Sequence, residues 1–300
     1  LVLPDVLPAL RSRGRPSPSM IFYSFGHAQN SFYSFKKIIP YLNSHDLFIC
    51  ASRAEARAFR LYYQNLQTIV LPFPVENWIS RRHRPSSRTQ KHLPLVYAGR
   101  IAREKNLHTF LRALAIVKRI APEYLIGGVH IFGGLYLGGD SLNPTKAKIY
   151  LDNLKQLTHG LGLDSVVKWY GNWPTDKLWR KLSQKRFLFV SPSISLMEDF
   201  GLAAYRSLLL GNPAVLSAWG GHLDHFQQFQ KTVELVPVEI AGGIPRISAL
   251  RMAAAIVKSL AKNSKTVLTT SRTSDVRQMR QLAKVALDSI LNLRQNERRT

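Results

Sequence analysis

The sequence predicts an α/β protein built on parallel sheets and divided into two domains. Short apolar runs alternate along the chain with longer amphipathic stretches, which is the order of strands and helices in a parallel α/β fold. The apolar runs lack period-two alternation, as expected for strands that are buried on both faces. The length of 300 residues is more than one small core needs.

The predicted strands are short runs rich in β-branched and aromatic residues. In the first quarter they are Met20–Phe25, Leu47–Ala51 and Thr68–Leu71, with helices expected between them at Ser31–Leu42 and Arg53–Tyr63. The later strands are Leu95–Gly99, Val129–Phe132, Val166–Tyr170, Phe187–Val190, Ala214–Ser217 and Val233–Val236.

Helical spacing is clearest after the strand Leu95–Gly99. The apolar residues between Leu107 and Val117 fall on one helical face, and Pro122 lies just beyond. A second amphipathic stretch includes Tyr150 and stops near Gly160. A third is expected over Gly201–Leu210, before a Gly-Asn-Pro stop signal.

The stretch Trp78–His92 is strongly basic and almost without apolar residues after Ile79, which indicates a linker. The domains predicted from these features are a partial amino-terminal α/β domain, a basic linker, a Rossmann-like domain and a carboxyl-terminal helix. Their boundaries are 1–78, 79–94, 95–270 and 271–300.

The composition of the chain limits the classes of partner that it is expected to bind. Lys and Arg number 42 against 18 acids, a net charge of +24, which favours nucleic acid, an anionic membrane surface or phosphate-bearing small molecules. The same charge could also only tune solubility. No nucleic-acid motif is recognisable, so nucleic acid is not the expected partner.

The compartment is predicted from the single cysteine, Cys50, which lies in an apolar run and reads as a core residue. One cysteine permits no disulfide within the chain, which fits a reducing, cytoplasmic setting. No apolar run reaches the ~18–20 residues that span a bilayer, so any membrane contact would be peripheral.

Two charged segments follow strands that should end at one edge of the sheet. Arg100 and Lys105 lie between a strand end and a helix start, where cations could hold a diphosphate, or could simply be solvated. Glu198 precedes the helix start Phe200-Gly201-Leu202. It could accept bonds from sugar hydroxyls, or it or Asp199 could merely cap that helix.

Two glycine-bearing turns follow other strands. Gly220 and Gly221 come after Ala214–Ser217 and could allow a ligand to approach the backbone closely, although paired glycines are more often turns. Gly171 and Asn172 come after Val166–Tyr170. Their backbone could read a nucleobase edge, or form a plain strand-to-helix turn.

The order and spacing of these segments over Leu95–Val236 resembles the carboxyl-terminal domain of family 4 glycosyltransferases, the retaining "group 1" enzymes of the GT-B fold. The resemblance implies that Arg100 and Lys105 bind the donor diphosphate and that Glu198 contacts the donor sugar. Phe200, Gly201 and Leu202 match the backbone amides beside the donor. Ser24-Phe25-Gly26-His27 looks like the strand-end loop that carries an active-site His, which makes His27 a second catalytic candidate.

Three departures from the family pattern bear on activity. Where the family has a second glutamate that holds the nucleotide ribose, this chain has Arg206, which cannot accept a hydrogen bond. The donor could be held differently, the nucleotide could differ, or the enzyme could be impaired. After Gly220-Gly221 the nearest acid is Asp224 instead of a glutamate. The segment Leu1–Trp78 is shorter than the family's amino-terminal domain, so we expect an incomplete acceptor half.

The function implied by the resemblance is transfer of a sugar, with retention, from a nucleoside diphosphate sugar to a glycan or lipid-linked acceptor. No metal or other cofactor is implied, and the sequence has no Asp-x-Asp pair. A glycosidase would need two separated carboxylates and leaves the basic loops unexplained. The main alternative is a degenerate, non-catalytic protein of this fold or a basic polyanion-binding protein.

Overall fold

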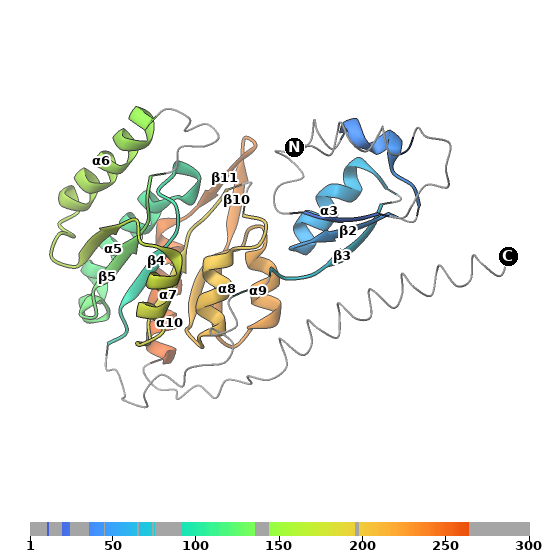
Figure 1. Cartoon of the computed structure of the whole chain (residues 1–300). Helices are drawn as coiled ribbons and strands as arrows, with labels where there is room; N and C mark the ends of the chain where they lie inside the picture. The colour runs from blue at the N-terminus through green and yellow to red at the C-terminus, as the bar shows by residue number, and fades with distance from the viewer. Residues whose placement is uncertain are drawn as a thin grey trace. The chain divides into compact units, whose positions relative to one another are not determined.

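The computed structural model describes residues 11, 20–24, 36–44, 46–64, 66–73, 75, 92–135, 144–195 and 198–263 (Figure 1). The chain divides into two compact units, and the boundary falls between Pro74 and Val75. Most of the expected linker, the carboxyl-terminal helix 271–300 and His27 lie outside the described residues.

The first unit contains a three-stranded parallel sheet in the order β1-β2-β3. Rings from the strands and the helix stack in its core, with Phe22 and Phe48 at 4.7 Å and Phe48 and Phe59 at 5.4 Å between centroids. Cys50 is fully buried there, as predicted. The elements are β1 (Ile21–Tyr23), η1 (Ile39–Tyr41), β2 (Leu47–Cys50), α3 (Arg53–Tyr62) and β3 (Gln67–Val70).

The second unit contains a six-stranded sheet in the order β6-β5-β4-β7-β8-β9, and every neighbouring pair is parallel. The predicted strands of this unit are confirmed to within one residue at each end. They are β4 (Leu95–Ala98), β5 (Val129–Phe132), β6 (Val167–Gly171), β7 (Leu188–Ser191), β8 (Ala214–Ser217) and β9 (Val233–Val236).

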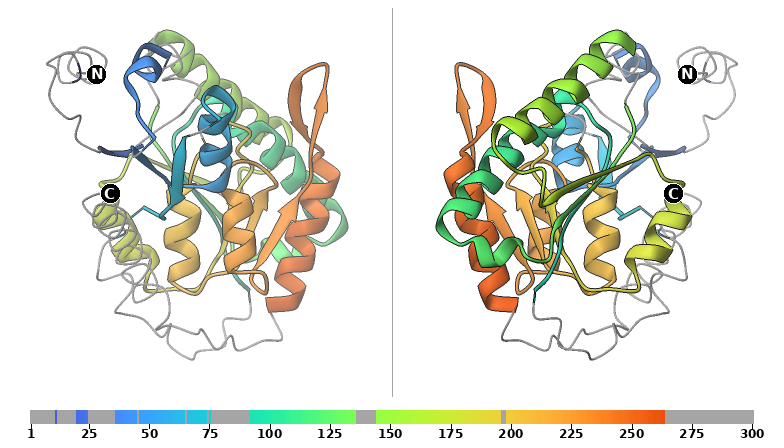
Figure 2. Two further views of the ribbon diagram at one scale, coloured as in Figure 1. Left: turned by 90° about the vertical axis from the view of Figure 1, so that its right-hand side faces the viewer. Right: turned by 90° about the vertical axis from the view of Figure 1, so that its left-hand side faces the viewer.

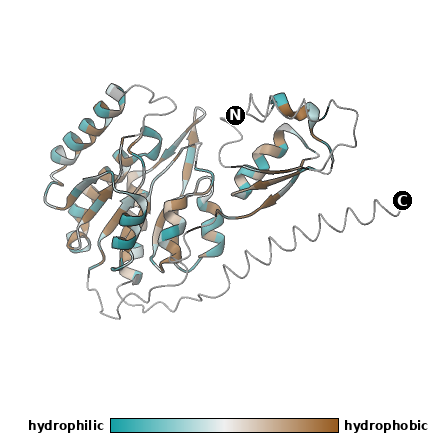
Figure 3. Ribbon diagram, viewed as in Figure 1, coloured by the Kyte–Doolittle hydropathy of each residue, from teal (hydrophilic) through white to brown (hydrophobic). Residues whose placement is uncertain are grey.

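Helices cover both faces of this sheet and bury its apolar strands between them (Figures 2 and 3). One core cluster joins the sheet to α5, α6 and α10, and the other joins it to α7 and α8, with α9 packed against that side. The bounds are α5 (Leu107–Ile120), α6 (Pro144–Gly160), α7 (Thr175–Leu182), α8 (Leu202–Leu209), α9 (His222–Gln228) and α10 (Ala249–Asn263).

Four elements were not anticipated from the sequence: α7, α9, α10 and an antiparallel hairpin of β10 (Val238–Ala241) and β11 (Ile244–Ile247). The helix α7 is mostly polar, and only three of its residues are buried. Short 3-10 turns η2 (Arg103–Lys105) and η3 (Pro122–Leu125) flank α5. Among the residues that the structure describes, no helix is both long and apolar enough to span a bilayer.

The strand order places a topological switch point between β4 and β7. From β4 the chain adds β5 and β6 on one side, and from β7 it adds β8 and β9 on the other. The connections that follow β4 and β7 therefore lead to opposite sides of the sheet. In open parallel sheets, ligands bind at such a switch point, in the crevice between the two loops at the carboxyl ends of the strands.

Candidate functional site

The loop after β4 carries the predicted cations to this switch point. The phenol of Tyr97, buried in β4, donates a 2.7 Å hydrogen bond to the carbonyl of Arg100 and braces the turn. The backbone then forms η2 and changes direction at Asn106, whose left-handed φ of 57° starts α5. Asn tolerates this conformation better than most residues with a side chain. Lys105, just before this turn, is consequently only 9% exposed.

The loop after β7 meets the loop after β4 through the backbone. The amide of Ile194 donates a 2.9 Å hydrogen bond to the carbonyl of Glu104. This bond fixes the two loops against each other where they leave the neighbouring strands β4 and β7. Because this bond is made by main-chain atoms, it holds Ser193 and Lys105 on facing sides of the crevice independently of their own side chains.

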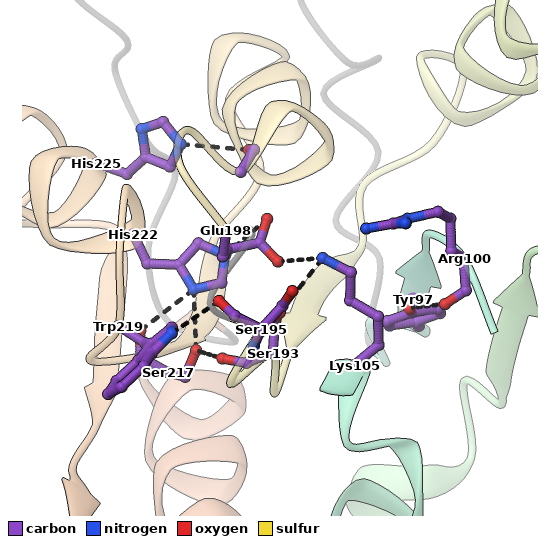
Figure 4. A network of polar contacts seen from close by, with 11 residues as sticks. Tyr97, Arg100, Lys105, Ser193, Ser195, Glu198, Ser217, Trp219, His222 and His225 are labelled. Carbon is purple, nitrogen blue, oxygen red and sulfur yellow. Dashed lines mark hydrogen bonds and ion pairs between the residues drawn. The ribbon is translucent and has the colours of Figure 1, made fainter. Parts of the chain in front are cut away.

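Lys105 and Glu198 form an ion pair across the crevice, although they are 93 residues apart (Figure 4). The Lys105 ammonium donates to the Glu198 carboxylate at 2.5 Å and to the Ser193 hydroxyl at 3.4 Å. Both charged side chains are 11% exposed. The Arg100 side chain extends toward the same ammonium in Figure 4. The structure thus brings two of the sequence-predicted donor-site residues, Lys105 and Glu198, into direct contact.

Glu198 is ionised in this setting. Burial alone raises the pKa of a carboxyl group, but the Lys105 charge, His222 and hydrogen bonds from Lys105 and Ser193 outweigh burial and lower the pKa of Glu198 to about 2. The residue at the N-cap of α8 is Gly201, which has no side chain, and the Glu198 carboxylate is bonded to Lys105. Glu198 is therefore an ionised hydrogen-bond acceptor held by a cation.

The amino terminus of α8 lies directly after Glu198. Gly201 precedes the helix with a left-handed φ of 73°, and a side chain there would stand 2.8 Å from the His222 ring. The Phe200 ring packs on Tyr205 and His225, which turns its side chain into the core of the unit. Without a side-chain cap, the amides of Phe200, Gly201 and Leu202 start a helix whose dipole favours an anion.

The paired glycines hold the Glu198 loop in place. We expected Gly220 and Gly221 to allow close approach of a ligand, but the close approach in the structure is to the chain's own backbone. A Cβ on Gly220 would lie 2.1 Å from the Glu198 carbonyl, and one on Gly221 would lie 2.3 Å from the Asp199 carbonyl. The Gly221 amide donates to that Glu198 carbonyl at 2.8 Å. Their role is to position Glu198.

A buried polar network lies beneath Glu198. The ring of His222, 0% exposed, places Nε2 4.0 Å from Glu198 Oε1 and Nδ1 within 3.0 Å of the Ser217 hydroxyl. The Ser217 hydroxyl donates to the Ser193 carbonyl, and the Trp219 indole donates to the Ser195 carbonyl at 2.8 Å. These contacts tie the ends of β7 and β8 together under the carboxylate (Figure 4).

The remaining predicted residues lie at other places on the same unit. Gly171 and Asn172 end β6 at the carboxyl edge, where the Gly171 carbonyl accepts from Gly133 at 2.9 Å. Arg206 lies one turn into α8 and is half-buried. None of these three has a recorded contact with Lys105 or Glu198 in the described part of the chain.

Sequence reasoning missed the supporting residues of the site. Ser193 lies five residues before Glu198 and Trp219 directly precedes Gly220, but neither residue type at these positions indicates a role in the site. His222 directly follows the glycine pair, and that position was the only signal that could have drawn attention to it. Its burial depends on packing against Gly201, which spacing along the sequence does not reveal.

Comparisons with known proteins place this geometry in a family. The family model described as "Glycosyl transferases group 1" matches residues 80–242, more than half of the chain. That span contains Arg100, Lys105, Glu198 and His222. No curated protein sequence matches significantly.

Solved structures agree on the fold. HepE of Anabaena in complex with UDP and glucose is 18% identical with a TM-score of 0.59, over 90% of this chain and 72% of that one. A UDP-forming α,α-trehalose-phosphate synthase from Burkholderia vietnamiensis is 12% identical with a TM-score of 0.67, over 99% and 72%. WaaG, a glycosyltransferase of lipopolysaccharide biosynthesis, is 12% identical with a TM-score of 0.59, over 86% and 73%. These structures share the GT-B fold, and by its family match the chain belongs to the group 1 glycosyl transferases.

Proposed function

We propose that this protein transfers a sugar from a nucleoside diphosphate sugar to a hydroxyl acceptor, with retention of configuration at the anomeric carbon. The observation that carries the proposal is the Lys105–Glu198 pair at the switch point between β4 and β7. A cation for a phosphate and an ionised acceptor for sugar hydroxyls stand side by side there. Family membership and the UDP and UDP-glucose complexes of HepE support the same class of donor.

The diphosphate of the donor would be bound by cations and a helix terminus. Lys105 offers a point charge and Arg100 a guanidinium that can bind two oxygens at once. The uncapped amino terminus of α8, with Phe200, Gly201 and Leu202, favours an anion at the same place. Charge that develops on the leaving diphosphate is thereby stabilised, which lowers the barrier to transfer.

Glu198 would bind the hydroxyls of the donor sugar in its ionised form. In the reaction the bond from the anomeric carbon to the diphosphate breaks while the acceptor oxygen bonds to the same face of that carbon. The acceptor proton passes to an oxygen of the leaving diphosphate. This scheme uses no protein nucleophile and no metal ion, because the cations already oppose the diphosphate charge.

The acceptor in this proposal is a glycan or a lipid-linked glycan presented at the cytoplasmic surface of a membrane. The support is the net charge of +24, which attracts the protein to anionic lipid. Co-sedimentation with vesicles of phosphatidylglycerol and phosphatidylcholine, compared with phosphatidylcholine alone, tests this part. Equal sedimentation with both would remove the membrane from the proposal.

The main test measures transfer by the purified chain and by Glu198→Ala, after a thermal-shift panel of UDP-, GDP- and ADP-sugars has identified the donor. Glu239→Ala is the control, since Glu239 lies in the exposed hairpin and pairs with Arg251 at 2.7 Å. We expect the control to keep its rate and Glu198→Ala to lose it. Equal rates for both variants would remove Glu198 from the mechanism.

A non-catalytic donor-binding protein is the second candidate, because Arg206 stands where the family has its second glutamate. Stabilisation by a nucleotide sugar without any transfer would favour it. Arg206→Glu then decides whether this one residue is responsible. A gain of transfer in that variant would assign the impairment to Arg206, and no gain would assign it elsewhere.

A further inference from the structure

His222 is a buried base directly beneath the carboxylate that faces the crevice. It is fully buried, its Nε2 atom has no hydrogen-bond partner, and that atom lies 4.0 Å from Glu198 Oε1. A buried nitrogen without a hydrogen-bond partner lowers the stability of the fold, so its presence in a native structure calls for an explanation. The function proposed above uses Glu198, Lys105 and Arg100 but leaves this nitrogen unexplained.

Hydrogen bonding fixes the proton of the neutral ring on Nδ1. The Ser217 carbonyl, 3.2 Å from Nδ1, can only accept, and the Ser217 hydroxyl already donates to the Ser193 carbonyl. Nδ1 must therefore carry the hydrogen, which leaves a lone pair on Nε2 that points toward an anionic oxygen. A hydrogen bond from His222 to Glu198 can form only after Nε2 gains a proton.

Without a donor, Lys105 neutralises Glu198 at 2.5 Å and no proton is needed on His222. A diphosphate that enters the crevice attracts the same ammonium and adds negative charge near Glu198. The Glu198 carboxylate then needs another cation. The His222 ring, with Nε2 4.0 Å from Glu198 Oε1, becomes one when it gains a proton.

We infer that His222 is a positioning residue that takes up a proton from solvent at Nε2 when a donor diphosphate draws Lys105 away, and that the resulting imidazolium holds Glu198 on the sugar. The inference rests on the proposed function, since it needs a diphosphate in the crevice. No bond other than N–H forms, and the charge that Lys105 gave to Glu198 is supplied by the imidazolium.

The electrostatic surroundings of His222 favour this exchange. Burial has the largest effect and lowers the pKa of His222. The nearby Glu198 carboxylate raises this pKa, and the Lys105 ammonium lowers it. The neighbouring ring of His225, whose own pKa is lowered to about 3 chiefly by burial, remains neutral and adds no charge. Moving Lys105 onto an anion therefore raises the pKa of His222, because the repulsion is removed while the attraction stays.

Proton uptake on binding is measurable by titration calorimetry near pH 7 in PIPES and in Tris, which differ in ionisation enthalpy. The probes are UDP-glucose, GDP-mannose and ADP-glucose, because their phosphates do not titrate near neutral pH. We expect uptake of about one proton per bound sugar nucleotide, and affinity that falls about tenfold per pH unit between the pKa of His222 in the free protein and its higher pKa in the complex. The direction follows from the sign of the linkage: uptake on binding makes binding weaker as pH rises.

His222→Gln separates positioning from titration. Its amide nitrogen can donate to Glu198 at every pH, so proton uptake should vanish while transfer stays within a fewfold of the unsubstituted chain. His222→Phe keeps the ring shape without a donor and should lower the transfer rate by about 10- to 100-fold. His130→Gln removes another half-buried histidine with a lowered pKa, away from the crevice, and should leave the uptake intact.

Two outcomes overturn the inference. Binding of a sugar nucleotide without proton uptake, or with uptake that persists in His222→Gln, removes His222 and leaves the proposed function standing. Failure of all three probes to bind removes the donor site itself, and this inference with it.

Discussion

Asp46 in the first unit and Glu198 in the second are both acidic side chains held out of water beside a cation, but their partners differ in kind. Asp46 accepts two hydrogen bonds from one guanidinium nitrogen of Arg11, Nη2, at 2.8 and 2.9 Å, and one each from the amides of Met20 and Asn43 at 2.9 and 2.8 Å. Three donor groups make four hydrogen bonds to its two oxygens, and two of these groups are main-chain amides that cannot leave without unfolding.

Glu198 is held by side chains that can move. One oxygen accepts from Lys105, the Ser193 hydroxyl also bonds to the carboxylate, and Oε1 faces His222 at 4.0 Å, beyond hydrogen-bond distance. A carboxylate held by the backbone stabilises one structure, whereas a carboxylate held by a flexible ammonium and a hydroxyl can exchange partners with a ligand. The difference teaches that burial alone does not separate structural from functional charges, while the type and number of donors does.

The largest effect expected from this comparison is on stability, at Asp46. Asp46→Ala removes the acceptor of four hydrogen bonds, two of them from the Arg11 guanidinium, which should cost about 3–5 kcal/mol of unfolding free energy. Chemical denaturation followed by circular dichroism measures the loss. Sugar-nucleotide binding by the molecules that remain folded should not change. A loss under about 1 kcal/mol would show that Asp46 is not the anchor that its hydrogen bonds suggest.

Glu198→Gln should lower the transfer rate strongly and the stability only slightly, the opposite of Asp46→Ala. Loss of the charge should reduce the transfer rate by about 10²–10³-fold, the usual cost of one transition-state contact. Its unfolding free energy should fall by only about 1–3 kcal/mol, the range for one hydrogen bond to a charged group. A rate loss matched by an equally large stability loss would contradict the distinction between the two carboxylates.

The coupling between Lys105 and Glu198 is expected to be smaller. In a double-mutant cycle of Lys105→Met and Glu198→Gln, the unfolding free energies should depart from additivity by about 0.5–3 kcal/mol. Repeating the cycle with saturating donor should reduce the coupling, since the donor competes for Lys105. Coupling that is unchanged by the donor would mean that the pair does not open on binding.

The fold of the second unit followed from its sequence because strands buried on both faces read as continuous apolar runs. β8, which directly follows Pro213, is an example in which every residue is buried. The elements that were missed have little apolar area to signal them. α7 buries only Leu178, Trp179 and Leu182, and the hairpin β10–β11 is largely exposed around Gly242 and Gly243. The apolar pattern of a sequence indicates which segments are buried, and these elements bury few apolar residues.

The strand topology made it possible to predict from the sequence which loops form the site. Two parallel strands whose loops carry Lys105 and Glu198 bring those loops to one edge, whatever their separation in sequence. That the two side chains pair directly depends on Gly220, whose backbone touches that of Glu198. That His222 lies beneath them depends on Gly201, which leaves room for the His222 ring. Such contacts come from three-dimensional packing that strand and helix patterns do not encode. The role expected for His27 falls on residues outside the described part and stays a prediction.

The smallest effect we predict is that of metal removal. Excess EDTA should leave transfer unchanged, because Lys105 and Arg100 provide two positive charges opposite a diphosphate, and a metal ion there would compete with the ammonium for the same oxygens. A metal acting as a Lewis acid contributes several kcal/mol to a transition state, so its removal would slow transfer by orders of magnitude. Loss of activity that Mg²⁺ or Mn²⁺ restores would refute the metal-free scheme. It would also change the meaning of the central comparison, since Glu198 would then exchange Lys105 for a metal ion instead of a protonated histidine.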